Sequence, residues 1–452
     1  MKSKLNTFSW LLVFTLLVLF LIPGYSPAND KSQKIDELMT TYHKYRLFNG
    51  SVLVAEQGKI IYKNGFGFAN MEWDIPNDPI TKFRLGSITK QFTSMLIMQL
   101  VEMEKLRVDD KLADLLPYYR EDTGKQVMVH HLLTHTSGIP SYTGLPNFFA
   151  EISRNPYPVE DFVKKFCSND FEFEPGTKFK YNNSGYFLLG AIIEKITGKT
   201  YEQVLHENIL DPLGMKNTGY DHHKTILKKR ATGYEKTFDS FQNSAYLDMG
   251  LPYAAGSLYS TVEDLYTWDQ ALYGEKLLSN KYKKIMFQPF LKKYAYGWGV
   301  RKVAGNNHTD SLTFISHGGG INGFSTLITR IIEDKILVVL LNNTGGTNLN
   351  EMNDGILKIL NNKPYNPPKL SIAETLYKTI IEKDVQASVK QYHQLKKEKP
   401  GHFNFSEAEL NQLGYTLIQK KKMSDAIEIF KLNVEAFPEA FNVYDSLGEA
   451  YS

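Results

Sequence analysis

The chain has little cysteine, little net charge and few long apolar runs, and each shortage excludes a class of protein. Cys167 is the only cysteine among 452 residues, so no disulfide can form within the chain and its stability must come from core packing. The formal net charge of +3 is spread without a dominant basic block, which argues against nucleic acid as a partner. Hydrophobic residues at 42% and charged residues at 22% indicate an ordinary globular protein.

The one long apolar run lies at the N-terminus and is typical of an export signal. Lys2 and Lys4 precede it, residues 10–22 are almost all apolar, and Ser26-Pro27-Ala28 offers small residues for cleavage. The run falls short of the ~20 residues that a membrane-spanning helix needs. We therefore predict a signal peptide over residues 1–28 and an exported protein, periplasmic or secreted. An uncleaved N-terminal membrane anchor is the alternative.

Strand-like segments occur early and late in the chain, with helical patterns between them. Alternation from Gly50 to Asn70 predicts a β-hairpin, with turn signals at Gln57-Gly58 and Asn64-Gly65. Short β-branched and aromatic runs return at residues 296–303, 312–316, 324–332 and 335–341. An antiparallel sheet assembled from both regions, flanked by helices and interrupted by a helical insertion, predicts an α+β fold.

The last part of the chain is patterned as helices. Leu413-Gly414 and Leu447-Gly448 lie 34 residues apart, which is the period of tetratricopeptide repeats. Repeat arrays usually need about three units to bury a continuous core, so an incomplete pair must dock elsewhere, pair with another chain or remain marginal. We interpret this tail as a packing appendage. A surface for a protein partner is the alternative.

These patterns divide the chain into four parts. After the signal peptide, residues 29–362 form the main domain, and the proline-rich residues 363–369 form a linker. Residues 370–452 then form the incomplete, tetratricopeptide-like helical region.

Ser87 and Lys90 are the first candidates for chemistry. They lie three residues apart at the start of a helical pattern, which places both side chains on one face. An amine at that distance can take the proton of a serine nucleophile. The pattern alone is weak, although no other serine of the chain has a lysine at this spacing.

Two further segments contain groups that suit acyl transfer. Tyr181-Asn182-Asn183 offers a phenol that can move a proton and an amide that can orient a carbonyl or a lysine. Tyr62-Lys63-Asn64 has the same pattern, but we assign it to the hairpin turn. His317-Gly318-Gly319-Gly320 allows close approach of backbone to a ligand, and one of its N–H groups could form an oxyanion hole with that of Ser87.

His131 and His135 lie four residues apart, a spacing that on a helix would suit a metal pair. Thr136-Ser137-Gly138 ends the helix at once, and the acidic residue expected of a metalloprotease is missing. We therefore expect capping and packing roles for both histidines and no bound metal.

Taken together and in order, Ser87-Ile88-Thr89-Lys90, Tyr181-Asn182-Asn183 and His317-Gly318-Gly319 resemble the three motifs of serine β-lactamase-related hydrolases of the class C type. That group includes penicillin-binding carboxypeptidases, D-amino-acid peptidases and esterases. The resemblance covers roughly residues 33–345 and implies the β-lactamase/transpeptidase-like fold. It implies Ser87, Lys90 and Tyr181 as catalytic residues and no cofactor. It also implies substrate-binding roles, assigned to Asn183, His317, Gly318, Gly319 and Gly320.

One departure from the class C pattern bears on the substrate. Class C β-lactamases carry Lys-Thr-Gly as the third motif, whereas this chain has His317-Gly318-Gly319. A histidine, with an ordinary pKa of about 6.5, holds a substrate carboxylate less firmly at neutral pH than a lysine does.

We therefore predict an exported serine hydrolase that forms an acyl-enzyme on an amide, peptide or ester bond of a small molecule or peptide. A penicillin- or peptidoglycan-binding protein with negligible turnover is the alternative. His317 is expected to hydrogen-bond Tyr181 or the substrate. Whether Lys90 or Tyr181 is the general base stays open.

Overall fold

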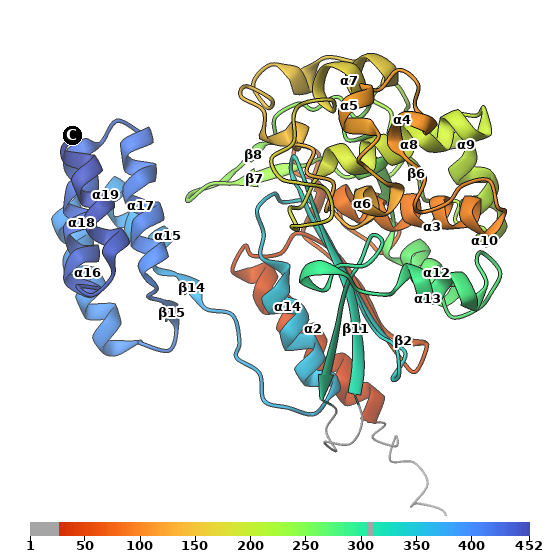
Figure 1. Cartoon of the computed structure of the whole chain (residues 1–452). Coiled ribbons are helices and arrows are strands. Elements are labelled where there is room, and N and C mark those ends of the chain that lie inside the picture. The colour runs from red at the N-terminus through yellow and green to blue at the C-terminus, as the bar shows by residue number, and fades with distance from the viewer. Residues whose placement is uncertain (1–26, 305–310) are drawn as a thin grey trace, which may run out of the picture.

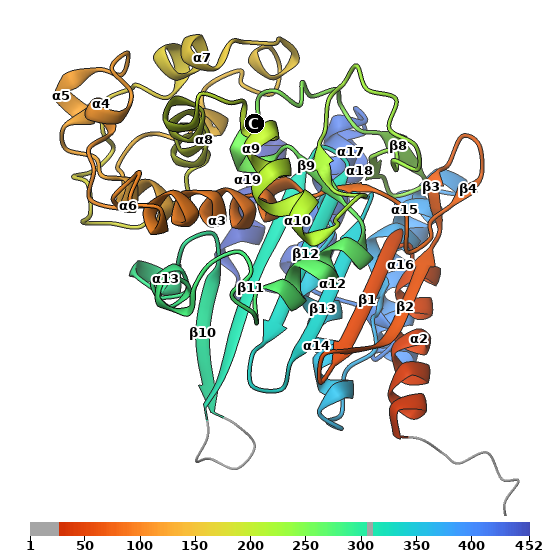
Figure 2. The same cartoon turned by 90° about the vertical axis from the view of Figure 1, so that its right-hand side faces the viewer.

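A computed structural model describes residues 27–304 and 311–452, so most of the predicted signal peptide lies outside the described residues. A six-stranded antiparallel sheet forms its centre, with the order β10-β11-β12-β13-β1-β2 (Figure 2). Its strands are β1 (Gly50–Glu56), β2 (Lys59–Phe66), β10 (Gly299–Ala304), β11 (Ser311–Ile321), β12 (Phe324–Ile331) and β13 (Ile336–Asn342). Early and late strands join between β1 and β13, which confirms the predicted α+β fold.

The first hairpin follows the prediction at one turn and departs from it at the other. Gln57 and Gly58 connect β1 to β2 as expected, but β2 continues through the second predicted turn, and Gly65 pairs with Ser51. A Cβ on Gly65 would lie 2.2 Å from the carbonyl oxygen of Asn77. Glycine is therefore required at this position by a close approach of two chain segments, and the predicted turn at Asn64-Gly65 is wrong.

The central strands are buried on both faces, which explains their continuous apolar sequences. In β1, Val52 and Val54 pack with α2 (Pro27–Lys44) and α14 (Leu349–Leu360) on one face of the sheet. Leu53 and Ala55 point to the other face and join the core formed with the helical insertion. The strand period of two thus assigns alternate side chains of one strand to two separate cores.

The helical insertion lies between β2 and β10 and covers the second face of the sheet (Figure 2). Its longer helices are α3 (Thr89–Glu102), α7 (Val159–Phe166), α8 (Asn183–Thr197), α12 (Val262–Ala271) and α13 (Asn280–Met286). Its shorter helices are α4 (Leu112–Leu115), α5 (Glu121–Gly124), α6 (Val129–Leu133), α9 (Tyr201–Leu205), α10 (Asp211–Leu213) and α11 (Tyr253–Gly256). α3 is buried along almost its whole length, so this helix holds its first residues in a fixed position against the sheet.

Five helices form the tail, which has a hydrophobic core of its own and lies beside the sheet domain (Figure 1). They are α15 (Ile372–Glu382), α16 (Val385–Glu398), α17 (Glu407–Gln419), α18 (Met423–Ala436) and α19 (Phe441–Tyr451). Between α17 and α18 the packing is close, since a Cβ on Gly414 would lie 2.4 Å from the Phe430 ring. The helices are compatible with the predicted repeat, and the assignment to tetratricopeptide repeats stays a prediction.

A two-stranded hairpin links the tail to the sheet domain. Its strands are β7 (Tyr234–Lys236) and β8 (Phe241–Asn243), and Phe238 at its tip stacks on Tyr377 of α15 at 5.4 Å. Arg46, which follows α2, donates to the carbonyl oxygens of Phe238 and Ser240 and forms an ion pair with Glu374. The tail therefore docks on the rest of the chain. Within the two described ranges, the structure contains no helix that is both long and apolar enough to pass through a bilayer.

Candidate active site

Ser87 lies in the short 3₁₀ turn Gly86–Ile88 that leads directly into α3, with Lys90 in the first turn of the helix. Nζ of Lys90 is 3.0 Å from Oγ of Ser87, as the spacing of three residues predicts. Gly86 has a φ of +54°, and a Cβ there would lie 3.0 Å from the backbone nitrogen of Gly320. The glycine thus brings the turn against the end of β11.

Lys90 is completely buried, and all of its hydrogen-bonding partners are neutral. Besides Ser87, Nζ donates to Oδ1 of Asn183 at 2.9 Å and to the carbonyl oxygen of Ala255 at 2.8 Å. Burial lowers the pKa of the Lys90 amine well below its usual value, because the charged form loses its hydration and no partner carries a negative charge. Burial thus shifts the balance toward the neutral amine, which can accept a proton.

Tyr181 and Asn183 flank the N-terminus of α8. Asn182 caps this helix by accepting from the N–H of Gly185, which fixes the residues on either side of it. The Asn183 amide is oriented at both ends, because its Nδ2 donates to Thr143 at 3.2 Å while its Oδ1 accepts from Lys90. This contact matches the expectation that Asn183 positions the lysine.

The ring of Tyr181 covers Lys90, with Nζ 4.9 Å from the ring centroid. Tyr181 as a whole residue is 38% exposed. Its phenol group is surrounded by protein, and this burial raises the pKa of the phenol, whereas a hydrogen bond with the Ser87 side chain lowers it. The structure therefore brings the three predicted catalytic residues, Ser87, Lys90 and Tyr181, into one cluster.

The run His317-Gly318-Gly319-Gly320 belongs to β11, which continues through Ile321. Gly318, Gly319 and Gly320 pair with β12, whereas β10 stops pairing with β11 at Ser316. A Cβ on Gly319 would lie 2.0 Å from the carbonyl oxygen of Leu85, so only glycine lets the Ser87 turn approach this strand.

One of the two partners expected for His317, Tyr181, is replaced by another tyrosine, and the other, the substrate, stays a prediction. Its Nδ1 lies 2.6 Å from the Gly318 carbonyl oxygen and therefore carries the proton, and its Nε2 accepts from the Tyr294 hydroxyl at 2.9 Å. Burial and the nearby Lys90 lower the pKa of His317 to about 4. The ring is thus neutral and bonded within the protein, and the predicted hydrogen bond to Tyr181 is replaced by one to Tyr294.

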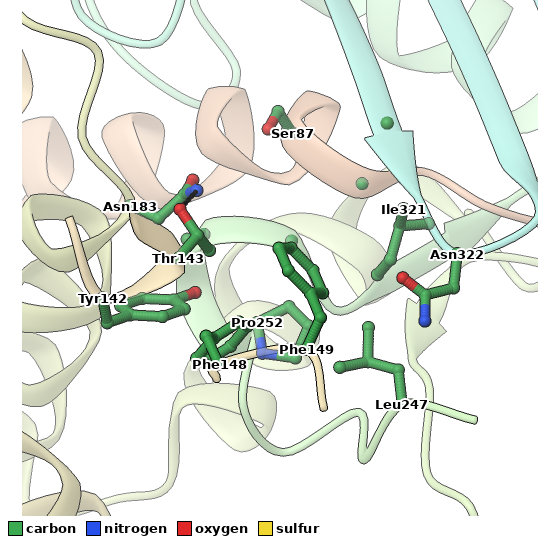
Figure 3. A pocket seen from close by; sticks show the side chains of 14 residues that line it. Ser87, Tyr142, Thr143, Phe148, Phe149, Asn183, Leu247, Pro252, Ile321 and Asn322 are labelled. Carbon is green, nitrogen blue, oxygen red and sulfur yellow. Dashed lines mark hydrogen bonds between the residues drawn. The ribbon is translucent and has the colours of Figure 1, made fainter. Parts of the chain in front are cut away.

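A hollow of about 210 Å³ opens beside Ser87 (Figure 3). Ser87 and Asn183 lie at one side of it, and Phe149, Pro252 and Leu247 lie across from them. Gly320 lines the same hollow as Ser87, so backbone from β11 and from the turn that carries Ser87 reach one space. This space can hold a carbonyl carbon near the serine.

Comparison with known proteins identifies the family. The family model described as beta-lactamase matches residues 32–361, which is more than half of the chain. The chain belongs to the beta-lactamase family. Penicillin-binding protein 4* of Bacillus subtilis (strain 168) is 32% identical over 369 residues, covering 75% of this chain and 78% of the relative. Teichoic acid D-alanine hydrolase of Staphylococcus aureus is 30% identical over 352 residues, covering 76% and 81%.

A solved structure agrees with the beta-lactamase fold. The D-amino acid amidase of Ochrobactrum anthropi SV3, complexed with L-phenylalanine amide, matches with a TM-score of 0.64. The match covers 74% of this chain and 99% of the amidase, at 24% identity. This chain is thus a serine hydrolase of the beta-lactamase-related family.

Three neighbours of this beta-lactamase-family site were not among the predicted site residues. Tyr294 binds His317, and the Ala255 carbonyl oxygen binds Lys90. His135, considered earlier only as a metal ligand or packing residue, accepts from the N–H of Asn182 and lies 4.3 Å from the Tyr181 ring. Its positive φ of 57° marks a constrained backbone position. No local spacing signals these contacts, because each joins separate parts of the fold.

His131 takes a structural position of its own. Its Nδ1 accepts from the N–H of Met128 at 3.3 Å, at the start of α6. His131 and His135 therefore each bond a backbone N–H, in agreement with the capping and packing roles expected of them.

Proposed function

We propose that this chain is an exported hydrolase that cleaves an amide, peptide or ester bond through an acyl-enzyme on Ser87. The observation that carries the proposal is the contact between Ser87 and Lys90, a buried amine without a carboxylate partner, at 3.0 Å. A neutral amine at this distance can take the hydroxyl proton as Oγ attacks a carbonyl carbon.

We assign the proton-accepting role to Lys90, because burial lowers its pKa and raises that of the Tyr181 phenol. In the acylation step the Oγ–C bond forms, the C–O or C–N bond of the substrate breaks, and the serine proton passes through Lys90 and Tyr181 to the leaving atom. A water molecule then attacks the acyl carbon, its proton passes through the same pair to Oγ, and the Oγ–C bond breaks, which releases the acid and regenerates Ser87. The substrate-binding roles of Asn183 and of His317 to Gly320 belong to this proposal.

Two backbone N–H groups are suited to hold the oxyanion of the intermediate. They belong to Ser87, at the start of the helical turn, and to Gly320, on the neighbouring strand. Both residues line the hollow, and preorganised donors of this kind typically contribute 10²- to 10³-fold to the rate.

The proposal is tested with a fluorophosphonate probe and an ester substrate. We expect wild type and the exposed-serine control Ser311→Ala to be labelled once per chain and to hydrolyse p-nitrophenyl acetate through many turnovers. Ser87→Ala should lose labelling and hydrolysis together. Persistent hydrolysis in Ser87→Ala would refute the mechanism.

The second candidate, a penicillin-binding protein with negligible turnover, is favoured by the name of the Bacillus subtilis relative. It predicts that a fluorescent penicillin labels Ser87 stoichiometrically, with a single burst and no further product. Continued product release separates the hydrolase from this alternative.

We further propose the predicted division of the chain, with residues 363–369 as the linker between hydrolase and tail. It is supported by the separate hydrophobic core of the tail helices. Limited proteolysis of the full chain should cut first within 363–369. A first cut inside α17 or α18 would contradict the division.

A further inference from the structure

The walls of the hollow beside Ser87 carry no charge. Fourteen described residues line it, and none of them is Asp, Glu, Lys, Arg or His. Its polar side chains are hydroxyl and amide groups, including those of Thr143, Asn183 and Asn322. Such groups bind neutral carbonyl and amide functions, and none of them neutralises an ion.

The adjoining hollow along β11 is also without charged side chains. His317 and Asn348 line it, and none of its described lining residues is Asp, Glu, Lys or Arg. His317 is held neutral by burial and by Lys90, which lower its pKa to about 4. Both of its ring nitrogens are bonded to protein groups, so it offers neither a positive charge nor a free donor to a carboxylate.

The far wall of the hollow beside Ser87 is aromatic and aliphatic. Phe149 is 59% exposed, and its ring meets the buried Phe148 edge to face at 5.0 Å. Phe148 in turn lies 5.3 Å from Tyr142, and Leu247 faces the same space (Figure 3). An exposed ring supported by other rings is a surface that a further aromatic or apolar group can cover.

We propose that the substrate is an uncharged ester or amide whose acyl part carries an aromatic or other apolar side chain, with no carboxylate or ammonium beside the scissile bond. This assignment rests on the proposed function. A charged group placed in either hollow would lose hydration without gaining a partner of opposite charge. The apolar acyl group would instead be stabilised by burial against Phe149 and Leu247.

Matched esters of phenylacetic acid test the charge preference. The leaving groups are 4-hydroxybenzamide and 4-hydroxybenzoate, and a phenylglycine ester of 4-hydroxybenzamide adds an ammonium on the acyl side. Each kcat/KM is divided by the rate constant for hydroxide-catalysed hydrolysis of the same ester. We expect the neutral ester to exceed both charged esters by about tenfold or more.

Equal or better turnover of either charged ester would overturn the assignment. This outcome is distinct from failure of the proposed function. A wild-type chain that neither takes up fluorophosphonate at Ser87 nor hydrolyses any ester overturns the hydrolase itself. A chain that is labelled at Ser87 and hydrolyses charged and neutral esters equally well overturns only the proposed substrate class.

Variants of the wall test the acyl side independently. Phe149→Ala should lower the ratio of phenylacetyl to acetyl ester turnover by about tenfold, since truncating an apolar contact surface costs this much in discrimination. Trp73→Ala is the matched control, because Trp73 is 79% exposed and does not line the hollow. An unchanged ratio in Phe149→Ala would overturn the apolar acyl site.

A gain of function completes the test. Leu247→Lys adds a cation to the wall and should raise turnover of the 4-hydroxybenzoate ester about tenfold relative to the neutral ester. Ile226→Lys, at a position that is 94% exposed, should leave this ratio unchanged. If Leu247→Lys leaves the ratio at its wild-type value, charge in the hollow does not govern selection and the assignment fails.

Discussion

Arg330 and Lys90 are buried basic side chains whose surroundings are opposite. Arg330 of β12 is 1% exposed, and its Nε donates to the carboxylate of Asp269 in α12, which is also 1% exposed. Lys90 is fully buried, and its three hydrogen-bonding partners are a hydroxyl, an amide oxygen and a backbone carbonyl. Among the residues that the structure describes, the Arg330 guanidinium has a counter-ion and the Lys90 amine has none.

Burial removes water from both side chains, but its effect on protonation differs between the two sites. At Arg330 the guanidinium stays charged, and burial outweighs its attraction so that the pKa of Asp269 is raised. At Lys90 the lack of a counter-ion lowers the pKa of the amine and makes its proton removable. We infer that the first site holds the helix on the sheet and the second prepares a base.

Replacing Lys90 is the strongest test of the inference that its buried site prepares a base. Lys90→Met should lower kcat/KM for an ester by about 10³-fold or more, because Ser87 loses its proton acceptor. Its melting temperature should stay equal or rise, since a buried polar amine is replaced by an apolar chain of similar length. Lys283→Met is the control, because Lys283 is also buried and donates to the carbonyl oxygens of Leu272 and Gly274. Activity within tenfold of wild type would contradict the role of Lys90.

Removing the counter-ion of Arg330 should lower stability and leave activity unchanged. Asp269→Ala leaves the Arg330 guanidinium buried without a counter-ion, and we expect the free energy of unfolding to fall by about 3–5 kcal/mol. Activity per folded molecule should be kept. Urea denaturation with active-site titration measures both quantities, and an unchanged midpoint of unfolding would show that the pair does not hold the helix.

Giving Lys90 a counter-ion should convert one environment into the other. Asn183→Asp places a carboxylate where Oδ1 now lies 2.9 Å from Nζ. The carboxylate favours the ammonium form and raises the pKa of Lys90, so less neutral amine is present at a given pH. We expect kcat/KM at neutral pH to fall about tenfold or more and to recover as the pH rises.

The control for that variant is Asn322→Asp, which puts the same charge on the wall of the hollow. Its pH profile for a neutral ester should keep the wild-type position. If the pH profile of Asn183→Asp coincides with that of wild type, the activity does not depend on the protonation state of Lys90.

The sequence allowed the parts of this site that depend on local spacing to be predicted. Ser87 and Lys90 meet because helical geometry fixes a separation of three residues. The chemistry of a phenol and an amide singled out Tyr181 and Asn183, the resemblance to a family assigned their roles, and the fold brings both beside Lys90. The paired strands were predictable from alternation and from β-branched and aromatic runs. Their ends were less so, since Gly65 serves a close contact between two segments instead of a turn.

The rest depends on tertiary contacts without a local signature. Arg330 and Asp269 lie 61 residues apart, and each looks like any other charged residue in its own segment. His317 was expected to hydrogen-bond Tyr181 or the substrate, yet Tyr294 approaches it from the segment before β10. Which ring reaches a histidine depends on packing that a pattern does not encode.

The last comparison concerns His317, whose pKa is lowered to about 4 in the folded chain by burial and by Lys90. The unfolded chain, with an ordinary histidine pKa of about 6.5, binds more protons between these two values. Stability from neutral His317 is therefore present above pH 6.5 and is lost as the pH falls toward 4, by at most about 1.4 kcal/mol per pH unit.

His317→Gln should weaken the loss of unfolding free energy between pH 6.5 and 4.5, whereas the exposed control His223→Gln should not. Equal slopes for wild type and His317→Gln in urea denaturation would mean that His317 becomes protonated within the folded site, and the contrast between a neutral site and a charged pair would then be lost.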